Sequence, residues 1–559
     1  MTHTASLRET TLTKSTKRIE LQCTYCDWVG SYDSPLNACP KCGENILRAR
    51  YDLAALRRSG WVDKIMAREA GLWRYHELLP IYDTQNIVTM GEGGTPLLHA
   101  RNLGMLLGLR NLYIKDERQG PTASFKDRQA SVAISVMRER GIREAVVAST
   151  GNVAIAYAAF AARAGIKLWA FLTSMVPGEK MREAALYGGE VIKVTGTYDH
   201  TKVVANGFAK QRGLYVDRGI KSIAAVESMK TMAFEIAQQL GWRAPDWFIQ
   251  AVSGGMGPIG VAKGFEELME LGLADKIPAL GVIQSAGCAP MVRAFKNGRT
   301  VATPVENPQT VIATLSTGDP GRAYEQLNNL IITHGGTMEE ATDEEAFNAL
   351  RLVARTEGLS VEPATAVAFA GLIKLARRGI IKPDQLVIVN CSGHTFPVEK
   401  QILGDQFARS VDVSAQSGRI SLPAEGLLSA LEQMETTARR VVVIEDNTDA
   451  GRLIERILKV QGNYEVYLAN GGAEGVVMVE RVKPDVIITD LMMPDIDGFS
   501  VIDALKADPN TAHIPIIVLT AKELTVHERM RLNGQIERLL QKGSFMDEDL
   551  LQSIVKALG

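Results

Sequence analysis

Short apolar runs alternate with longer helical segments over positions 51–409, and this alternation constrains the fold more than any other feature. The run at 145–148 precedes a helical segment that starts near Val153, and the run at 247–252 precedes a helical segment at Pro258. Strands that alternate with helices in this way are typical of parallel sheets covered by helices. The sequence therefore predicts an α/β fold for most of the chain.

The 559 residues are enough for about three or four domains of about 150 residues each. From 411 to 437 the pattern fades into Ser, Gln, Gly and Pro and then a short amphipathic piece, which predicts a linker. Beyond it, short β-branched runs at 441–444, 486–489 and 516–519 are separated by helical segments. These runs predict a small doubly wound sheet over 438–559.

The charge balance favours small-molecule chemistry, because the 62 Lys and Arg residues are nearly equal in number to the 64 Asp and Glu residues. We therefore expect no broad basic surface for nucleic acid or for an anionic membrane. The most apolar helical stretch, 153–162, is shorter than the about 20 residues that cross a bilayer. Positions 1–20 are polar, which predicts a disordered start, no secretory signal and a cytoplasmic protein.

Four of the six cysteines form two closely spaced pairs, Cys23-x-x-Cys26 and Cys39-x-x-Cys42. This spacing lets four thiolates surround a tetrahedral zinc ion, so we predict a zinc ribbon over 21–50. Disulfides are the less favoured alternative, because a cytosolic chain keeps its thiols reduced.

Lys126 lies in Pro-Thr-Ala-Ser-Phe-Lys-Asp-Arg, where small hydroxylated residues precede the lysine. This pattern suggests an imine-forming lysine and hence a pyridoxal-phosphate enzyme. Such an enzyme also needs a holder for the cofactor phosphate. Gly254, Gly255, Met256 and Gly257 follow a predicted strand and start a predicted helix, where backbone amides and the helix dipole face an anion. The alternative for this turn is a tight strand-to-helix connection.

A second anion-binding turn is predicted at Ser149-Thr150-Gly151-Asn152, again between a strand and a helix. Hydroxyls and amides of Ser149 and Thr150 are expected to hold the substrate carboxylate, while Asn152 reaches the phenolic oxygen of the cofactor.

Together these segments resemble the threonine synthase family within the tryptophan-synthase-like group of pyridoxal-phosphate enzymes, over most of positions 20–405. The segments at 72–75, 91–97, 357–358 and 362–364 add to the resemblance. It implies a two-subdomain catalytic domain, which we place at 51–410. Lys126 would then form the internal aldimine, Gly254 to Gly257 would hold the phosphate, and Ser392 would meet the ring nitrogen. We also expect that the chain can form a homodimer.

The resemblance implies conversion of O-phosphohomoserine and water to threonine and phosphate. Two positions depart from the family: Val153 stands where threonine is common, and the segment 222–230 lacks the arginine expected to grip the substrate phosphate. Ser222, Lys221 and Lys230 are the substitutes nearby. The alternatives are elimination or replacement on another amino acid, such as a phosphorylated serine or threonine itself, or a phosphorylation-controlled amino-acid-binding regulator.

In the last segment, Glu445 and Asp446 end one predicted strand and Asp490 ends another, so the three carboxylates should meet at one sheet edge and bind magnesium. With Thr520 and Lys542 they resemble the receiver domains of response regulators, over 438–559. The resemblance implies phosphorylation of Asp490 by a histidine kinase or phosphotransfer protein, with Thr520 and Lys542 as switch residues. A module kept only for docking is the alternative.

Overall fold

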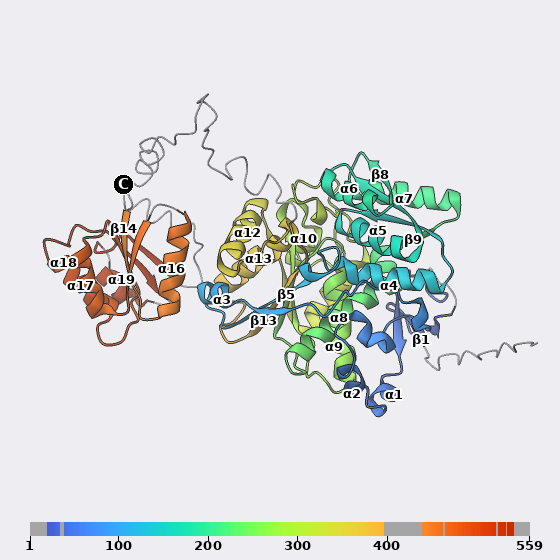
Figure 1. The fold of residues 1–559 in the computed structure, drawn as a ribbon, viewed down its shortest axis with the longest axis horizontal. Coiled ribbons are helices and arrows are strands. Elements are labelled where there is room, and N and C mark those ends of the chain that lie inside the picture. The colour runs from blue at the N-terminus through green and yellow to red at the C-terminus, as the bar shows by residue number, and fades with distance from the viewer. Residues whose placement is uncertain are drawn as a thin grey trace, which may run out of the picture. The chain divides into compact units, whose positions relative to one another are not determined.

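The computed structural model describes residues 19–33, 38–395, 439–461, 464–520, 524–532 and 534–541. Positions 1–18 of the predicted start and the predicted linker 411–437 lie outside these ranges. The described strands form four sheets, which Figure 1 shows with their covering helices.

The first sheet is small and antiparallel, in the order β2-β1-β3. Its strands are β1 (Ile19–Cys23), β2 (Val29–Ser31) and β3 (Leu47–Tyr51). Ile19, Leu21 and Ala49 are buried in its core, because alternate residues of paired strands point to one face. Residues 19 and 20 thus belong to β1, which starts two residues before the predicted ribbon boundary at 21. Helices α1 (Leu53–Arg58) and α2 (Trp61–Met66) follow.

The second sheet is parallel, in the order β8-β7-β6-β9. Its elements are β6 (Glu144–Ser149), α5 (Asn152–Ala164), β7 (Lys167–Thr173), α6 (Gly178–Leu186), β8 (Glu190–Val194), α7 (Tyr198–Arg212) and β9 (Tyr215–Asp217). Ala145 and Val147 pack with α5 and with α4 (Lys126–Glu139), whereas Val146 packs with α7. Successive side chains of β6 therefore pack against helices on opposite faces of the sheet. Both faces are covered by helices, as is usual for parallel sheets.

The third sheet has six strands in the order β12-β11-β10-β13-β5-β4. Its strands are β4 (Leu97–His99), β5 (Asn111–Asp116), β10 (Trp247–Ala251), β11 (Ala279–Ser285), β12 (Gly336–Ala341) and β13 (Leu386–Cys391). The further helices of this region are α3 (Arg101–Leu107), α8 (Ile223–Gln239), α9 (Met256–Glu270), α10 (Pro290–Lys296), α11 (Arg322–His334), α12 (Asp343–Glu357) and α13 (Pro363–Arg377). The α/β fold predicted from the alternation is confirmed.

The fourth sheet is parallel, in the order β15-β14-β16-β17-β18. Its elements are β14 (Arg439–Ile444), α16 (Thr448–Gln461), β15 (Tyr464–Ala469), α17 (Gly472–Val482), β16 (Val486–Thr489), α18 (Gly498–Ala507), β17 (Ile516–Thr520), α19 (Val526–Leu532) and β18 (Arg538–Gln541). The three strands predicted from β-branched runs are β14, β16 and β17, and their central positions form the sheet's buried core.

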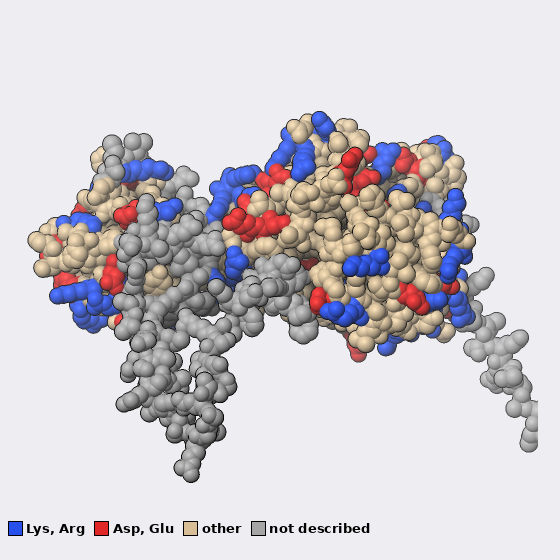
Figure 2. All heavy atoms as spheres, turned by 90° about the horizontal axis from the view of Figure 1, so that it is seen from above, with Lys and Arg blue, Asp and Glu red and all other residues tan. Residues whose placement is uncertain are grey.

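Among the described residues, no helix combines the length and apolar character needed to cross a membrane. Figure 2 shows basic and acidic side chains interspersed over the visible face of the described residues. This mixture agrees with the formal net charge of −2.

Candidate active site

Lys126 is the first residue of α4. The loop before it is joined to the end of β13, because Ser124 forms an antiparallel bridge with Gly393. The backbone N–H of Phe125 donates to the carbonyl of Ser392 at 2.9 Å. The predicted imine-forming lysine and the predicted partner of the ring nitrogen therefore lie in adjacent backbone segments.

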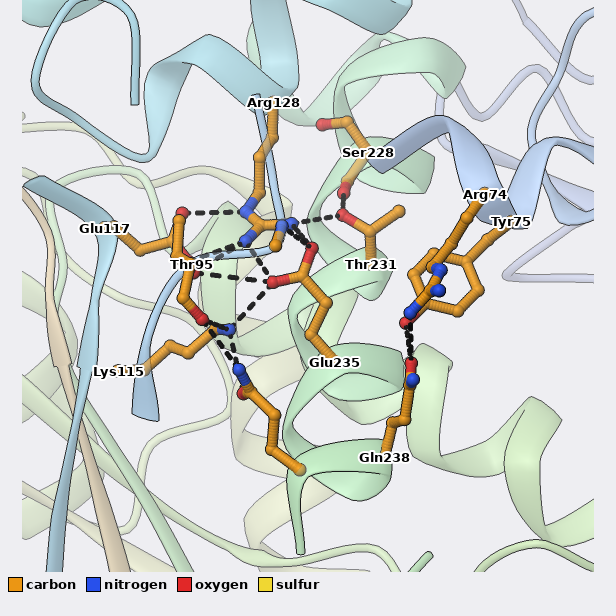
Figure 3. A network of polar contacts seen from close by, with 12 residues as sticks. Arg74, Tyr75, Thr95, Lys115, Glu117, Arg128, Ser228, Thr231, Glu235 and Gln238 are labelled. Atoms are coloured by element: carbon orange, nitrogen blue, oxygen red, sulfur yellow. Dashed lines mark hydrogen bonds and ion pairs between the residues drawn. The ribbon is translucent and has the colours of Figure 1, made fainter. Parts of the chain in front are cut away.

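A buried ion network fixes the first turn of α4 (Figure 3). The guanidinium of Arg128 donates to Glu117 and to Glu235, each at 2.7 Å, and Lys115 donates to Glu235 at 2.7 Å. Burial disfavours the charged form of Glu235, but Arg128 and Lys115 outweigh it and hold the pKa of this carboxyl below its ordinary value. Since Arg128 stands two residues after Lys126, the network ties the lysine's helix to β5 and α8.

The predicted phosphate turn lies between β10 and α9. Gly255 precedes the helix with a φ of 78°, which favours glycine. A Cβ on Gly254 would meet no atom within 4 Å, whereas a Cβ on Gly255 would lie 2.7 Å from Leu327 Cδ1. Backbone is therefore exposed to open space on one side of a helix N-terminus and packed on the other, an arrangement suited to a phosphate group.

The second predicted anion turn caps α5. Ser149 Oγ accepts the backbone N–H groups of Gly151 and Ala154, each at 3.0 Å. Asn152 Oδ1 accepts from Lys180 Nζ at 2.9 Å. This contact orients the Asn152 amide with its oxygen toward α6, so its NH₂ end is the one suited to donate to a phenolic oxygen.

Ser222 is the N-cap residue of α8 and Lys230 lies within this helix, and the side chains of both contact other protein side chains. Ser222 precedes the helix, is 8% exposed and shares a hydrogen bond with Asp217. Lys230 is fully buried and donates to Glu227 at 2.6 Å and to Glu267 at 3.0 Å. The suggestion that Lys230 replaces the absent arginine is thus wrong, because two carboxylates already hold its ammonium inside the protein.

The four paired cysteines converge on one point. The Cys23 and Cys42 sulfurs are 3.5 Å apart and the Cys26 and Cys39 sulfurs 3.6 Å apart. A tetrahedral ion with bonds of about 2.3 Å would hold its sulfurs about 3.8 Å apart, whereas a disulfide needs about 2.05 Å. The donor set fits zinc.

Three carboxylates, Glu445, Asp446 and Asp490, meet at the carboxyl edge of the fourth sheet, with ligand oxygens within 4.8 Å of one another. Asp490 is 6% exposed, and its Oδ1 accepts the backbone N–H of Leu491 at 2.6 Å. Thr520 ends β17 and is buried. Lys542 lies outside the described residues.

Comparison with known proteins identifies both parts of the chain. Residues 88–393 match the family model described as pyridoxal-phosphate dependent enzyme, and residues 441–555 match that of the response regulator receiver domain. The chain belongs to the pyridoxal-phosphate dependent enzyme family. It is a pyridoxal-phosphate-dependent lyase with threonine synthase relatives, fused to a receiver domain.

Threonine synthase of Methanocaldococcus jannaschii is 37% identical to the enzyme over 374 residues, 67% of this chain and 91% of the relative. Threonine synthase of Methanosarcina acetivorans is 35% identical over 375 residues, with the same two shares. Among solved structures, the processed form of threonine deaminase isoform 2 from Solanum lycopersicum gives a TM-score of 0.49 at 20% identity, covering 61% of this chain and 90% of that chain.

The residues around Lys126 fit the family's cofactor. Ser124 Oγ and both amide atoms of Asn390 are buried without a hydrogen-bond partner among the described residues. Ser124 is bridged to the segment that follows Asn390 and contains Ser392. Buried polar atoms of this kind call for a bound polar group, and the cofactor would supply one.

The sequence predicted roles for the lysine, both anion turns and Ser392, and these roles stay predictions. It gave no indication of the contacts that Arg128 and Lys180 make. The residues around Arg128 do not distinguish it from an exposed arginine on a helix surface, and its partner Glu235 is distant in the sequence. Lys180 likewise reaches Asn152 only through the packing of α6 beside α5. Gly498 was also missed: a Cβ there would lie 2.0 Å from the carbonyl oxygen of Asp490.

Proposed function

We propose that the enzyme is a threonine synthase, which converts O-phosphohomoserine and water to threonine and phosphate. The observation that carries this proposal is the 37% identity to a threonine synthase along 91% of that relative's length. The pairing of the Lys126 and Ser392 segments supports it, because the backbone segments that carry these two groups are hydrogen-bonded to each other.

Pyridoxal phosphate, when bound, supplies an electron sink for carbanions next to the amino group. Lys126 Nζ would hold the cofactor and then move protons between substrate carbons. Ser392 would face the ring nitrogen with a hydroxyl, which leaves that nitrogen largely uncharged. Backbone amides at 254–257 would hold the cofactor phosphate, and Asn152 would donate to its phenolic oxygen.

The substrate carboxylate would bind at the α5 N-terminus, where Ser149, Thr150 and the loop amides gather. Ser149 Oγ already accepts two backbone N–H groups, so its own O–H is the group suited to donate to the carboxylate.

A second candidate is elimination or replacement on another amino acid. Val153 offers no hydroxyl to a substrate oxygen. The segment 222–230 has no arginine to bind a substrate phosphate, and its residue Ala225 is a buried alanine without a polar side chain. Because Lys230 is held by Glu227 and Glu267, it does not restore the missing cation.

The test is to incubate cofactor-loaded protein with O-phosphohomoserine and to measure phosphate, threonine and ammonia. Phosphate and threonine in equal amounts, both absent with Lys126→Ala, support threonine synthase. Phosphate with ammonia but without threonine would favour elimination. No product from protein with an intact cofactor spectrum would contradict the proposed substrate.

For the receiver domain, we propose that Asp490 attacks the phosphorus of a phosphohistidine on a histidine kinase or phosphotransfer protein, which breaks the phosphorus–nitrogen bond. Magnesium held by Glu445, Asp446 and Asp490 would neutralise the transferred group. Thr520 and Lys542 are the proposed switch residues.

We also propose zinc as the ion held by the four paired cysteines. The domain boundaries at 21–50, 51–410, 411–437 and 438–559, the possible homodimer and the cytoplasmic location stay predictions from the sequence.

A further inference from the structure

Arg322, the first residue of α11, contacts both cysteine knuckles of the N-terminal sheet. Its guanidinium carbon lies 4.8 Å from the ring centre of Tyr25, which stands inside Cys23-x-x-Cys26. Its Nη2 is also paired with the carboxylate of Glu44, which follows Cys42 by two residues. Arg322 therefore contacts one residue from each half of the proposed metal site.

The knuckle itself fixes Glu44. The backbone N–H of Cys39 donates to the Glu44 carbonyl at 2.7 Å, and Gly43 N–H donates to the Cys39 carbonyl at 2.9 Å. One helical turn after Arg322, Gln326 accepts a hydrogen bond from Arg48 of β3. Two residues on one face of α11 are thus bound to the N-terminal sheet, because positions four apart share a helix face.

The neighbouring face of α11 packs against the phosphate turn. A Cβ on Gly255 would lie 2.7 Å from Leu327 Cδ1 and 3.5 Å from Ala323 Cβ, and both side chains are fully buried. Ala323 and Leu327 each follow, by one residue, the two positions that bind the N-terminal sheet. A shift of α11 would therefore move the Ala323 and Leu327 side chains that pack against Gly255, since close-packed interiors transmit displacements.

We propose that Arg322 is a positioning residue that couples metal binding by the four cysteines to retention of the cofactor phosphate. When the metal assembles the two knuckles, Tyr25 and Glu44 hold Arg322, and α11 supports the turn at 254–257. This rests on the zinc and pyridoxal-phosphate sites proposed above. Arg322 touches neither group and acts through the helix that carries it.

The test compares the parent, Arg322→Met and the matched surface control Arg163→Met. For each, zinc content is measured by metal analysis, and the dissociation constant of pyridoxal phosphate is measured by absorbance before and after zinc removal with a chelator. Arg322 is 42% exposed on its side chain, so a moderate effect is expected. We expect zinc removal to weaken cofactor binding of the parent by about 3- to 10-fold.

Arg322→Met should keep its zinc, bind the cofactor about 3- to 10-fold more weakly than the parent, and lose little more when zinc is removed. Arg163→Met should behave as the parent. Equal losses on zinc removal in the parent and in Arg322→Met would overturn the role of Arg322. Unchanged cofactor affinity in both zinc-free parent and Arg322→Met would overturn the coupling, whereas a parent that holds no zinc would contradict the metal site itself.

Discussion

The backbone N–H of Phe125 lies 2.9 Å from the carbonyl oxygen of Ser392, and this hydrogen bond holds the loop of Lys126 against the end of β13. The two segments are distant in the sequence, so neither local propensity nor spacing sets their separation. Their pairing fixes the backbone that carries the lysine relative to the backbone that carries the serine, and the proposed cofactor site needs such a fixed relation.

Lys126→Ala should remove the visible absorbance band that a lysine-linked cofactor gives and should lower turnover by about 100-fold or more, because no other group replaces the lost amine. Absorbance titration with pyridoxal phosphate measures the first effect. Lys210→Ala, on an exposed position of α7, is the control and should keep both. A retained band in Lys126→Ala would remove its assignment.

Arg128→Met should destabilise the catalytic domain by about 3–5 kcal/mol, because it leaves Glu117 and Glu235 buried without their shared cation. Arg128→Lys should fall between, since a lysine cannot donate to both carboxylates in the same fork geometry. Urea unfolding measures the change. The exposed control Arg163→Met should stay within about 0.5 kcal/mol of the parent, and a similarly small change for Arg128→Met would contradict the network's role.

Asp127 should make stability depend on pH. Burial raises the pKa of this carboxyl from 3.8 to about 7. Between about pH 4 and 7 the unfolded state therefore binds fewer protons than the folded state, so the free energy of unfolding falls as pH rises through this window. Asp127→Asn should remove this contribution, whereas the exposed Asp63→Asn should not. The difference between parent and variant across pH 4–8 is the measurement, and a constant difference would contradict the raised pKa.

Cys39→Ser should abolish stoichiometric zinc binding, because a four-thiolate site loses one ligand. Metal analysis of purified protein should give one zinc per parent chain. Cys288→Ser is the matched control, since Cys288 is a buried free cysteine outside the cluster, and it should retain the metal. Full zinc occupancy in Cys39→Ser would rule out this ligand set.

Asp490→Asn should block labelling by a small phosphodonor in the presence of Mg²⁺, because the acceptor oxygen is lost. Asp495→Asn makes the same exchange at an exposed position with a φ of 66°, which asparagine tolerates, and should label as the parent does. Labelling is followed by mass increase of the intact chain. Undiminished labelling of Asp490→Asn would place the acceptor elsewhere.

Much of this architecture could be predicted from local patterns. The run at 145–148 became the centre of β6, and the three C-terminal runs became β14, β16 and β17, because β-branched runs bounded by helical segments are local signals. Glu445 and Asp490 could be paired in advance, because parallel strands bring their carboxyl ends to one edge.

The sequence by itself determined the α/β class, because the alternation of strands and helices is a local pattern. Motif, spacing and strand-end position also sufficed to predict roles for the lysine, the glycine turn, the four cysteines and the receiver carboxylates. Only the tertiary structure decided which charges are buried together. It placed Lys230 between Glu227 and Glu267 rather than at the substrate, Lys180 against Asn152, and Arg322 between two knuckles. The physical reason is that a charged side chain's partner is chosen by packing between distant elements, and no local pattern records that choice.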